Sequence, residues 1–287
     1  MRRKIVKRIN LAKSAGFCFG VKNAITKALE TAKTNNSVVM LGDIVHNEDV
    51  VRQLRDSGIK KISRLSDGKG KTLLIRAHGC SRRTLEQALK SGYKISDATC
   101  PMVKEIHKIA CALENDGYQI IVIGDKLHDE VQGIVGQLKS KAIVIDKPKN
   151  TPLERIKKIK KCAVVVQSTQ NLDNVLAVRE VLRKYIPIVK FHNTICNPTK
   201  TKQNEIKAMP LENDVMIIIG SKTSANTKRI YEISKSLNKN SYWINSADQI
   251  RKRWLATAKN IGITAGASTP ASTIHKVTLT IKAIVSD

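Results

Sequence analysis

Three observations in the sequence predict an α/β fold made of three similar units. Strand-like apolar segments alternate with segments whose apolar residues recur at helical spacing. Three cysteines, Cys18, Cys100 and Cys196, each follow an expected strand and open an expected helix. A glycine that ends a further apolar strand comes 24 residues after each of them. Repetition at a period of about 80–95 residues indicates small domains and not the turns of a solenoid.

Each expected domain contains the same elements in the same order. The domains span residues 18–99, 100–195 and 196–287. The strands after the cysteines read VVMLG, IIVIG and VMIIIG and end at Gly42, Gly124 and Gly220. The later strands are LLIRAHG, AVVVQST and IGITAGAST, and they lead to His78, to Ser168 with Thr169, and to Ser268. Residues 1–17 hold a strand at about residues 4–12, which we expect to join the sheet of the third domain.

The composition excludes several classes of protein. The apolar runs are far shorter than the roughly 20 residues of a membrane span, and no secretory signal follows the basic amino terminus, so we expect a cytoplasmic protein. The net charge of +27 favours an anionic partner. Nucleic acid is the less favoured partner, because only 3% of the residues are aromatic and the basic residues are spread along the chain. Their densest run, Lys147 to Lys161, is interpreted as a solvated helix face with its preceding loop.

The three repeated cysteines indicate an iron–sulfur site. One cysteine per domain lacks the close pairs of a zinc ribbon and the spacing of a ferredoxin. Three thiolates could instead hold a 4Fe–4S cluster with one iron open to substrate, and the helix amino termini would lower their pKa. Cys111 and Cys162 are interpreted as inert packing residues, and the role of Cys80 stays open.

Polar side chains recur at fixed distances after the repeated glycines. His46, His128 and Ser224 come four residues after them, and Glu48, Glu130 and Asn226 come two residues later. At the carboxyl ends of parallel strands these groups would form a ring of donors suited to a phosphate or diphosphate. Glu130 is the best candidate for a proton relay, and Glu48 is a weaker one. His107, His192 and His275 have no repeated counterparts and are interpreted as structural or surface residues.

At these residues the sequence closely resembles the LytB family of 4-hydroxy-3-methylbut-2-enyl diphosphate reductases. The matching stretches lie in order along nearly the whole chain. They are GFCFGVKNAI, LGDIVHN, RAHG, DATCPMV, GDKLHDEV, VVVQSTQ, the segment around Cys196, GSKTSANT and TAGASTP.

The resemblance implies a trefoil of three α/β domains around an oxygen-sensitive 4Fe–4S cluster, here on Cys18, Cys100 and Cys196. It implies reductive removal of the substrate's hydroxyl group as water, which gives isopentenyl and dimethylallyl diphosphates with electrons from ferredoxin or flavodoxin. Glu130 then corresponds to the proton source, and Ser168 to a threonine near the substrate's hydroxyl end. The remaining matched residues correspond to the diphosphate pocket: His46, His78, His128, Ser224, Asn226 and Ser268.

The chain departs from the family pattern at two site positions. Ala225 stands where a second serine is usual, so one hydrogen bond to the diphosphate would be missing or come from a backbone amide. Asp129 stands where proline is common, which would loosen the loop that holds Glu130. Two alternatives remain at this point: a three-cysteine iron–sulfur enzyme like quinolinate synthase, and a basic nucleic-acid-binding protein.

Overall fold

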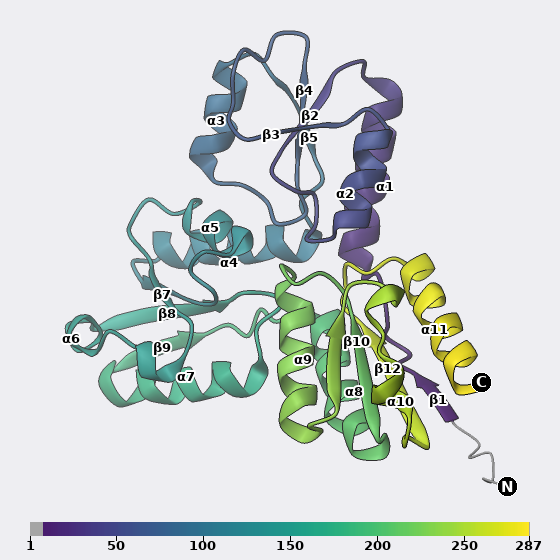
Figure 1. Ribbon diagram of the computed structural model, residues 1–287. Coiled ribbons are helices and arrows are strands. Elements are labelled where there is room, and N and C mark those ends of the chain that lie inside the picture. Colours follow the sequence, from purple (N-terminus) through teal and green to yellow (C-terminus); the bar gives the residue numbers. More distant parts are fainter. Residues whose placement is uncertain (1–7, 287) are drawn as a thin grey trace, which may run out of the picture. The chain divides into compact units, whose positions relative to one another are not determined.

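The structure, a computed structural model, describes residues 8–286 and contains three four-stranded parallel β-sheets. Helices alternate with the strands, so the predicted α/β class is confirmed (Figure 1). Of the strand expected over residues 4–12, residues 4–7 lie outside the described part of the chain.

The first sheet has the strand order β3-β2-β4-β5. Its elements are α1 (Phe19–Thr34), β2 (Val38–Leu41), α2 (Glu48–Asp56), β3 (Lys60–Ile62), β4 (Thr72–Ile75), α3 (Arg82–Lys90) and β5 (Lys94–Asp97). Cys18 directly precedes α1, and Cys100 follows β5 after two residues.

The second sheet repeats this arrangement with the order β7-β6-β8-β9. Its elements are α4 (Pro101–Asn115), β6 (Gln119–Ile123), α5 (Asp129–Val135), β7 (Ile143–Ile145), the 3₁₀ turn η1 (Pro148–Asn150), α6 (Leu153–Ile156), β8 (Lys161–Val166), α7 (Leu172–Tyr185) and β9 (Ile188–Phe191). β6 and β8 are Val/Ile-rich and almost wholly buried, as expected for strands covered by helices on both faces.

The third sheet has the order β11-β10-β12-β1, so the strand before Cys18 completes it. Its elements are α8 (Asn197–Glu212), β10 (Val215–Ile219), α9 (Ala225–Leu237), β11 (Ser241–Ile244), the 3₁₀ turn η2 (Ala247–Gln249), α10 (Lys252–Leu255), β12 (Asn260–Ala265), α11 (Ala271–Ser286) and β1 (Arg8–Leu11). β1 pairs with β12 in parallel, from Arg8 opposite Asn260 to Leu11 opposite Ile263.

Helices cover both faces of the third sheet. Apolar residues of α8 and α9 pack on one face against Met216 and Ile218 of β10. Apolar residues of α10 and α11 pack on the other face against Ile217 and Ile219 of the same strand. The alternation along β10 thus divides the core into two layers, and the same division holds for the second sheet.

The described chain forms two compact units. The central unit comprises residues 20–45 and 51–196 and holds the first two sheets. The C-terminal unit comprises residues 8–19, 46–50 and 197–286 and holds the third sheet. The first two sheets are assembled from the elements between one repeated cysteine and the next, and the third from elements after Cys196 together with β1. The three domain boundaries drawn from the sequence stay a prediction.

Two details differ from the sequence-based expectation. Each sheet contains an additional short edge strand (β3, β7 and β11) that the predicted alternation does not include, since three or four residues give too little periodicity to detect. The basic run from Lys147 to Lys161, expected to be a helix face with its preceding loop, forms η1, the single turn α6 and the start of β8. None of the described helices has the length and apolar character that crossing a membrane requires.

Candidate active site

Each repeated cysteine is held by the same backbone hydrogen bond. The N–H of Cys100 donates to the carbonyl of Ala77, at 3.0 Å, and the N–H of Cys196 donates to the carbonyl of Ser168, at 3.1 Å. In the C-terminal unit the N–H of Cys18 donates to the carbonyl of Ala267, at 3.1 Å. Each cysteine follows one strand, and its acceptor follows the neighbouring strand of the same sheet. In all three cases the acceptor is the second residue after that neighbouring strand ends. The repeat read from the sequence is therefore a repeat of local structure at the cysteines.

The acceptor residue also binds the loop that follows the central strand of its sheet. The N–H of Ala77 donates to the carbonyl of Ile44, and the N–H of Ser168 donates to Oε1 of Glu130. The N–H of Ala267 donates to Oδ1 of Asn226, at 2.9 Å. We refer to these three hydrogen-bonded arrangements, which are not disulfides, as the cysteine bridges. Through them Glu130 is linked to Cys196 within the central unit, and Asn226 is linked to Cys18 within the C-terminal unit.

The three bridge cysteines combine features that the other three do not, although Cys80 and Cys111 are also partly exposed. Cys18, Cys100 and Cys196 are partly exposed, and each stands directly before a helix of fifteen or more residues. Cys162 is fully buried in β8, and burial raises its thiol pKa to about 12. Burial also raises the pKa of Cys111, and it raises the pKa of Cys80 to about 11. Only the bridge cysteines thus combine access, a helix amino terminus and repeated geometry, as thiolate ligands require.

Glu130 is a buried carboxylic acid on the first turn of α5. It is 2% exposed, and both of its oxygens are bound by Ser168. The Ser168 N–H lies 2.6 Å from Oε1, and the Ser168 hydroxyl donates to Oε2 at 2.8 Å. Burial raises the pKa of Glu130, and the two bonds from Ser168 partly oppose that effect. A carboxyl group in this environment retains its proton to a higher pH than an exposed glutamate does.

His128 caps the same helix and has a defined tautomer. Its Nδ1 accepts the backbone N–H of Glu130, at 3.1 Å, so the neutral ring carries its proton on Nε2. The ring meets His78 edge to face, with centroids 5.3 Å apart. The structure thus brings four predicted residues into one network of the central unit: His78, His128, Glu130 and Ser168.

Asp129 does not leave the Glu130 loop loose, contrary to the expectation from the sequence. Its carboxylate forms a two-pronged ion pair with Arg76, with N–O distances of 2.7 and 2.9 Å. Gly42, which has a φ of +81°, leaves the space that the guanidinium fills, since a β-carbon there would lie 2.5 Å from Nη1 of Arg76. The pair ties the start of α5 to the segment after β4 that carries His78. It borders a cavity of about 330 Å³ whose walls include Cys80, Ser81 and Gln132.

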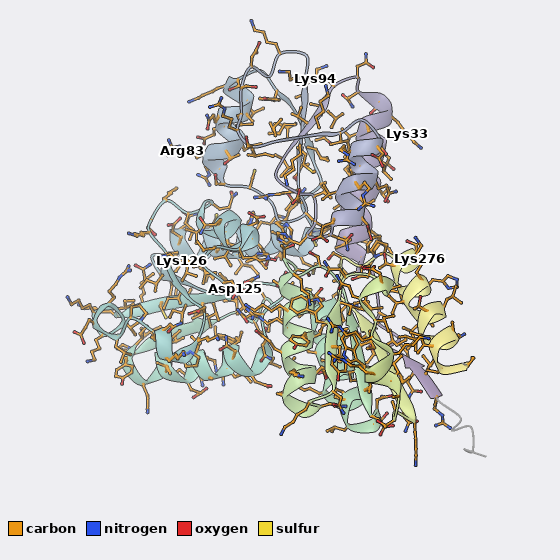
Figure 2. All side chains as sticks on the ribbon, viewed as in Figure 1. Lys33, Arg83, Lys94, Asp125, Lys126 and Lys276 are labelled. Atoms are coloured by element: carbon orange, nitrogen blue, oxygen red, sulfur yellow. The ribbon has the colours of Figure 1, made fainter. Side chains whose placement is uncertain are left out.

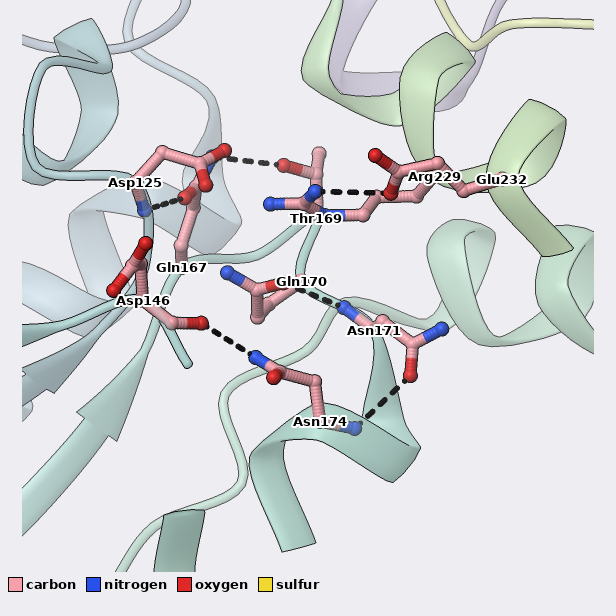
Figure 3. Close-up of polar contacts among 9 residues, drawn as sticks. All are labelled: Asp125, Asp146, Gln167, Thr169, Gln170, Asn171, Asn174, Arg229 and Glu232. Atoms are coloured by element: carbon pink, nitrogen blue, oxygen red, sulfur yellow. Dashed lines mark hydrogen bonds and ion pairs between the residues drawn. The ribbon is translucent and has the colours of Figure 1, made fainter. Parts of the chain in front are cut away.

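The segment after β8 is fixed from both sides (Figure 3). Gln167 is 1% exposed; its side chain accepts the N–H of Asp125 at 2.9 Å and donates to Oγ1 of Thr169 at 3.1 Å. Asn171 caps α7 by accepting the N–H of Asn174. These bonds hold Ser168, and with it the contact to Glu130, in place.

In the C-terminal unit, Asn226 presents an unused donor. Since Oδ1 of Asn226 accepts the N–H of Ala267, its Nδ2 is turned away, and this atom is buried without a hydrogen-bond partner among the described residues. Ser224 caps α9 by accepting the N–H of Thr227, which leaves its own hydroxyl proton for another acceptor. A buried donor of this kind is costly unless an acceptor is supplied, and an anionic ligand supplies one.

The remaining candidate residues lie as follows. The Ser268 hydroxyl donates to the main-chain carbonyl of His46, at 3.1 Å, within the C-terminal unit. Glu48 is exposed and accepts the hydroxyl of Ser221, so it does not share the buried environment of Glu130. Ala225 is buried at the start of α9.

The histidines interpreted as structural or surface residues differ in burial. Burial lowers the pKa of His107 to about 4, which keeps its ring neutral as expected for a core histidine. His192 is partly buried, and His275 is exposed on α11.

Two contacts beside the candidate site residues escape prediction from the sequence. Arg76 stands inside the RAHG stretch that the sequence singles out, but its partner lies 53 residues away and no periodicity connects the two. Gln167 lies in VVVQSTQ, and its role as a fixed point of the loop depends on a side-chain orientation. The one signal that marks Arg76 in advance is that a charged residue stands two positions before the candidate His78.

Comparison with known proteins identifies the family of the chain. The sequence model of the LytB protein family matches residues 9–282. The 4-hydroxy-3-methylbut-2-enyl diphosphate reductase of Aquifex aeolicus is 39% identical over 96% of this chain and 96% of its own. The enzyme of that name from Geobacter metallireducens is 39% identical over 97% of this chain and 98% of its own.

Two solved structures are similar over nearly the whole chain. One is a structure of (E)-4-hydroxy-3-methyl-but-2-enyl diphosphate reductase, the terminal enzyme of the non-mevalonate pathway. It is 39% identical, has a TM-score of 0.71, and covers 97% of this chain and 100% of its own. The other, the E-1-hydroxy-2-methyl-but-2-enyl-4-diphosphate reductase from Plasmodium falciparum, is 28% identical, has a TM-score of 0.86, and covers 96% and 87%. With a family match across almost all described residues and the repeated cysteine bridges in place, the chain belongs to the LytB family.

Proposed function

We propose that the chain is an oxidoreductase that converts 4-hydroxy-3-methylbut-2-enyl diphosphate to isopentenyl and dimethylallyl diphosphates. Two electrons and two protons enter, the allylic C–O bond breaks, and the hydroxyl group leaves as water. This is the last step of the methylerythritol phosphate (non-mevalonate) route to isoprenoids. The full-length family match supports this function over quinolinate synthesis and over nucleic-acid binding. The cytoplasmic location expected from the sequence is kept as part of the proposal, since it suits a step of small-molecule biosynthesis.

LytB proteins are iron–sulfur enzymes, and the cysteine bridges carry our assignment of the cluster. We assign one 4Fe–4S cluster to Cys18, Cys100 and Cys196, with one iron that has no protein ligand. The donor set fits, because three partly exposed thiols stand at helix amino termini in matched backbone geometry. Such a cluster, when bound, supplies single electrons and a Lewis-acidic iron for the substrate's hydroxyl oxygen.

Glu130 is the proposed proton source. Departure of a hydroxyl group as water consumes a proton at that oxygen, so a nearby acid must be protonated near neutral pH. Burial raises the pKa of Glu130, which favours the protonated form that this role needs. The Ser168 hydroxyl, which binds Oε2 of Glu130, is both donor and acceptor and can relay the proton. The carbonyl of Ser168 also accepts the N–H of Cys196, which supports a relay close to the proposed cluster ligand.

Diphosphate binding is assigned to His46, His78, His128, Ser224, Asn226 and Ser268. Two observations support the assignment, each within one unit. The buried Nδ2 of Asn226 offers a donor, and the tautomer of His128 leaves an N–H on Nε2. Neutral N–H donors of this kind can form hydrogen bonds to phosphoryl oxygens. The side chain of Ala225 cannot donate a hydrogen bond.

Electrons are proposed to come from a ferredoxin or a flavodoxin. Such donors are acidic, and the net charge of +27 favours their association.

The function is tested with protein purified and reconstituted without oxygen. We expect a brown protein that absorbs near 400 nm (an expectation for 4Fe–4S clusters in general) and reduces the allylic alcohol diphosphate. Cys18→Ser, Cys100→Ser and Cys196→Ser should each abolish that activity, whereas Cys111→Ser, which changes a thiol outside the bridges, should retain it. A colourless protein with full activity, or full activity in a bridge variant, would contradict the proposal.

A further inference from the structure

Lys202 is a lysine buried beside a proposed cluster ligand. It lies on the second turn of α8 and is 3% exposed. Lysine is almost never buried to this degree unless its ammonium group has partners. Within residues 8–286, the charged side chains classed as buried are those of Glu130, Lys202 and Arg229. Glu130 belongs to the proposed proton relay, and Arg229 pairs with Glu232.

The ammonium group joins the two chain segments that hold Cys18. Nζ of Lys202 donates to the main-chain carbonyl of Ser14, four residues before Cys18. It also donates to the carbonyl of Ala265, at 3.1 Å. Ala265 ends β12, and two residues later the carbonyl of Ala267 accepts the N–H of Cys18. Lys202 therefore fixes both sides of the Cys18 bridge.

A second residue of α8 reinforces this contact. Glu205, about one turn beyond Lys202, accepts the N–H groups of Lys13 and Ser14 at 2.6 and 3.1 Å, and it also accepts the Ser14 hydroxyl. The helix thus holds the segment before Cys18 with one cation and one anion. Since α8 begins directly after Cys196, the same helix connects two proposed ligands along the chain.

The site holds a positive charge that interacts electrostatically with Cys18. Burial lowers the pKa of Lys202 to about 8, while the neighbouring Cys18 and Glu205 act to raise it. The group is therefore mostly protonated at pH 7. A cation in a poorly solvated site interacts more strongly with nearby charge than the same cation at the surface.

We propose that Lys202 is a positioning residue that holds the Cys18 loop and raises the reduction potential of the cluster bound there. The inference rests on the proposed function, which places the cluster on Cys18. Reduction adds one negative charge to the cluster, and a fixed cation nearby stabilises the reduced state relative to the oxidised one. Hydrogen bonding, charge and burial around the sulfur ligands are the usual determinants of such potentials.

The test is a reductive titration of reconstituted protein, followed by the cluster's absorbance or electron paramagnetic resonance, with iron and sulfide counted in every sample. Lys202→Met should lower the equilibrium constant for one-electron reduction about tenfold, a shift of about 59 mV to more negative potential. Lys202→Arg, which keeps the charge, should shift the potential by less than half as much. Lys207→Met is the matched control, because Lys207 is an exposed lysine on the same helix, and it should leave the potential unchanged.

The outcomes separate this inference from the function on which it rests. A Lys202→Met protein with a full cluster and an unchanged potential overturns the inference and leaves the function intact. If Lys202→Met fails to hold a cluster that Lys202→Arg holds, the positioning role is supported. If both variants lose the cluster but retain the wild-type far-ultraviolet circular dichroism, the charge is not what matters, and the inference fails. Wild-type protein without a cluster overturns the proposed function itself.

Discussion

Glu130 has an environment that is unusual for glutamate, a residue type found mostly at the surface. The carboxyl group is buried, its backbone N–H is bound by His128, and its oxygens are bound by Ser168. Glu48, at the equivalent sequence position of the first domain, is exposed and bound to Ser221. The same sequence spacing thus places one glutamate in a buried site and the other at the surface. The difference arises because the N–H of Ala77 donates to the carbonyl of Ile44 and not to Glu48.

Replacing Glu130 tests its role in proton delivery. Glu130→Gln keeps the shape but removes the acid, so turnover should fall about 10²-fold or more while the cluster's absorbance and substrate affinity stay as in the wild type. Steady-state kinetics with a chemical reductant measures the change. Glu48→Gln is the matched comparison, and the smaller loss is expected there. Equal losses in the two variants would assign proton delivery elsewhere.

The raised pKa of Glu130 also predicts how turnover depends on pH. In the proposed mechanism the protonated carboxyl group is the active form, so turnover should fall as the pH rises through its pKa in the folded protein. Because burial raises that pKa, the decline should lie above the range near pH 4.3 in which ordinary glutamates titrate. A pH profile of kcat measures it, and the decline should be absent from the residual activity of Glu130→Gln. An identical decline in that variant would exclude Glu130 as its source.

At the scale of an element, α5 shows how a short helix is held by groups outside it. It has only seven residues and carries His128 as its cap, with Asp129 and Glu130 in its first turn. Its amino terminus is anchored by the ion pair with Arg76, which comes from the first sheet of the central unit. A helix this short gains little from its own hydrogen bonds, so its position depends on such contacts.

The Arg76–Asp129 pair gives a prediction for α5. Asp129→Ala should lower turnover several-fold by loosening the segment that positions Glu130, since small displacements of reacting groups are costly. Asp129→Pro should retain more activity than Asp129→Ala. His128 has the extended backbone (φ −74°, ψ 137°) that a following proline requires, and proline suits the first helical position. Kinetics and hydrogen exchange of the α5 amides measure both effects.

A double-mutant cycle provides the control. If Arg76 and Asp129 act through each other, then Arg76→Ala with Asp129→Ala should lose about as much as either single variant. Additive losses would show that the pair does not act as a unit.

Some elements of the fold could be predicted from the sequence and others could not. The cysteine–glycine spacing of 24 residues predicted the three parallel sheets, because the same helix and strand follow each cysteine. The edge strands β3, β7 and β11 escaped prediction, because their pairing is decided by neighbouring strands and not by their own pattern. The Arg76–Asp129 and Lys202–Ser14 contacts depend on tertiary structure over 53 and 188 residues. The periodicity of the local sequence does not predict such distant pairs.

On the scale of the whole molecule, the excess of basic residues is spread over the surface. Exposed basic side chains extend outward from both units, among them Lys33, Arg83, Lys94, Lys126 and Lys276 (Figure 2). A charge of this kind accelerates encounter with acidic partners without requiring one specific contact.

Electron transfer should therefore depend on salt. Raising the ionic strength from about 20 to about 200 mM shortens the range of electrostatic attraction, so the rate of cluster reduction by reduced flavodoxin should fall several-fold. Stopped-flow absorbance measures this rate. Reduction by a reduced viologen, which is a cation, provides the comparison and should not decline. The same decline with both reductants would show that attraction of an acidic donor is not responsible.

The pairing of β1 with β12 has a consequence for synthesis on the ribosome. Residues 8–11 are translated early, but their partners at residues 260–263 are translated about 250 positions later. At roughly 5–20 residues per second, this strand waits for about 12–50 seconds without its neighbour. Cys18 follows that strand, so we expect the proposed cluster to be assembled only after residues 260–263 have been translated.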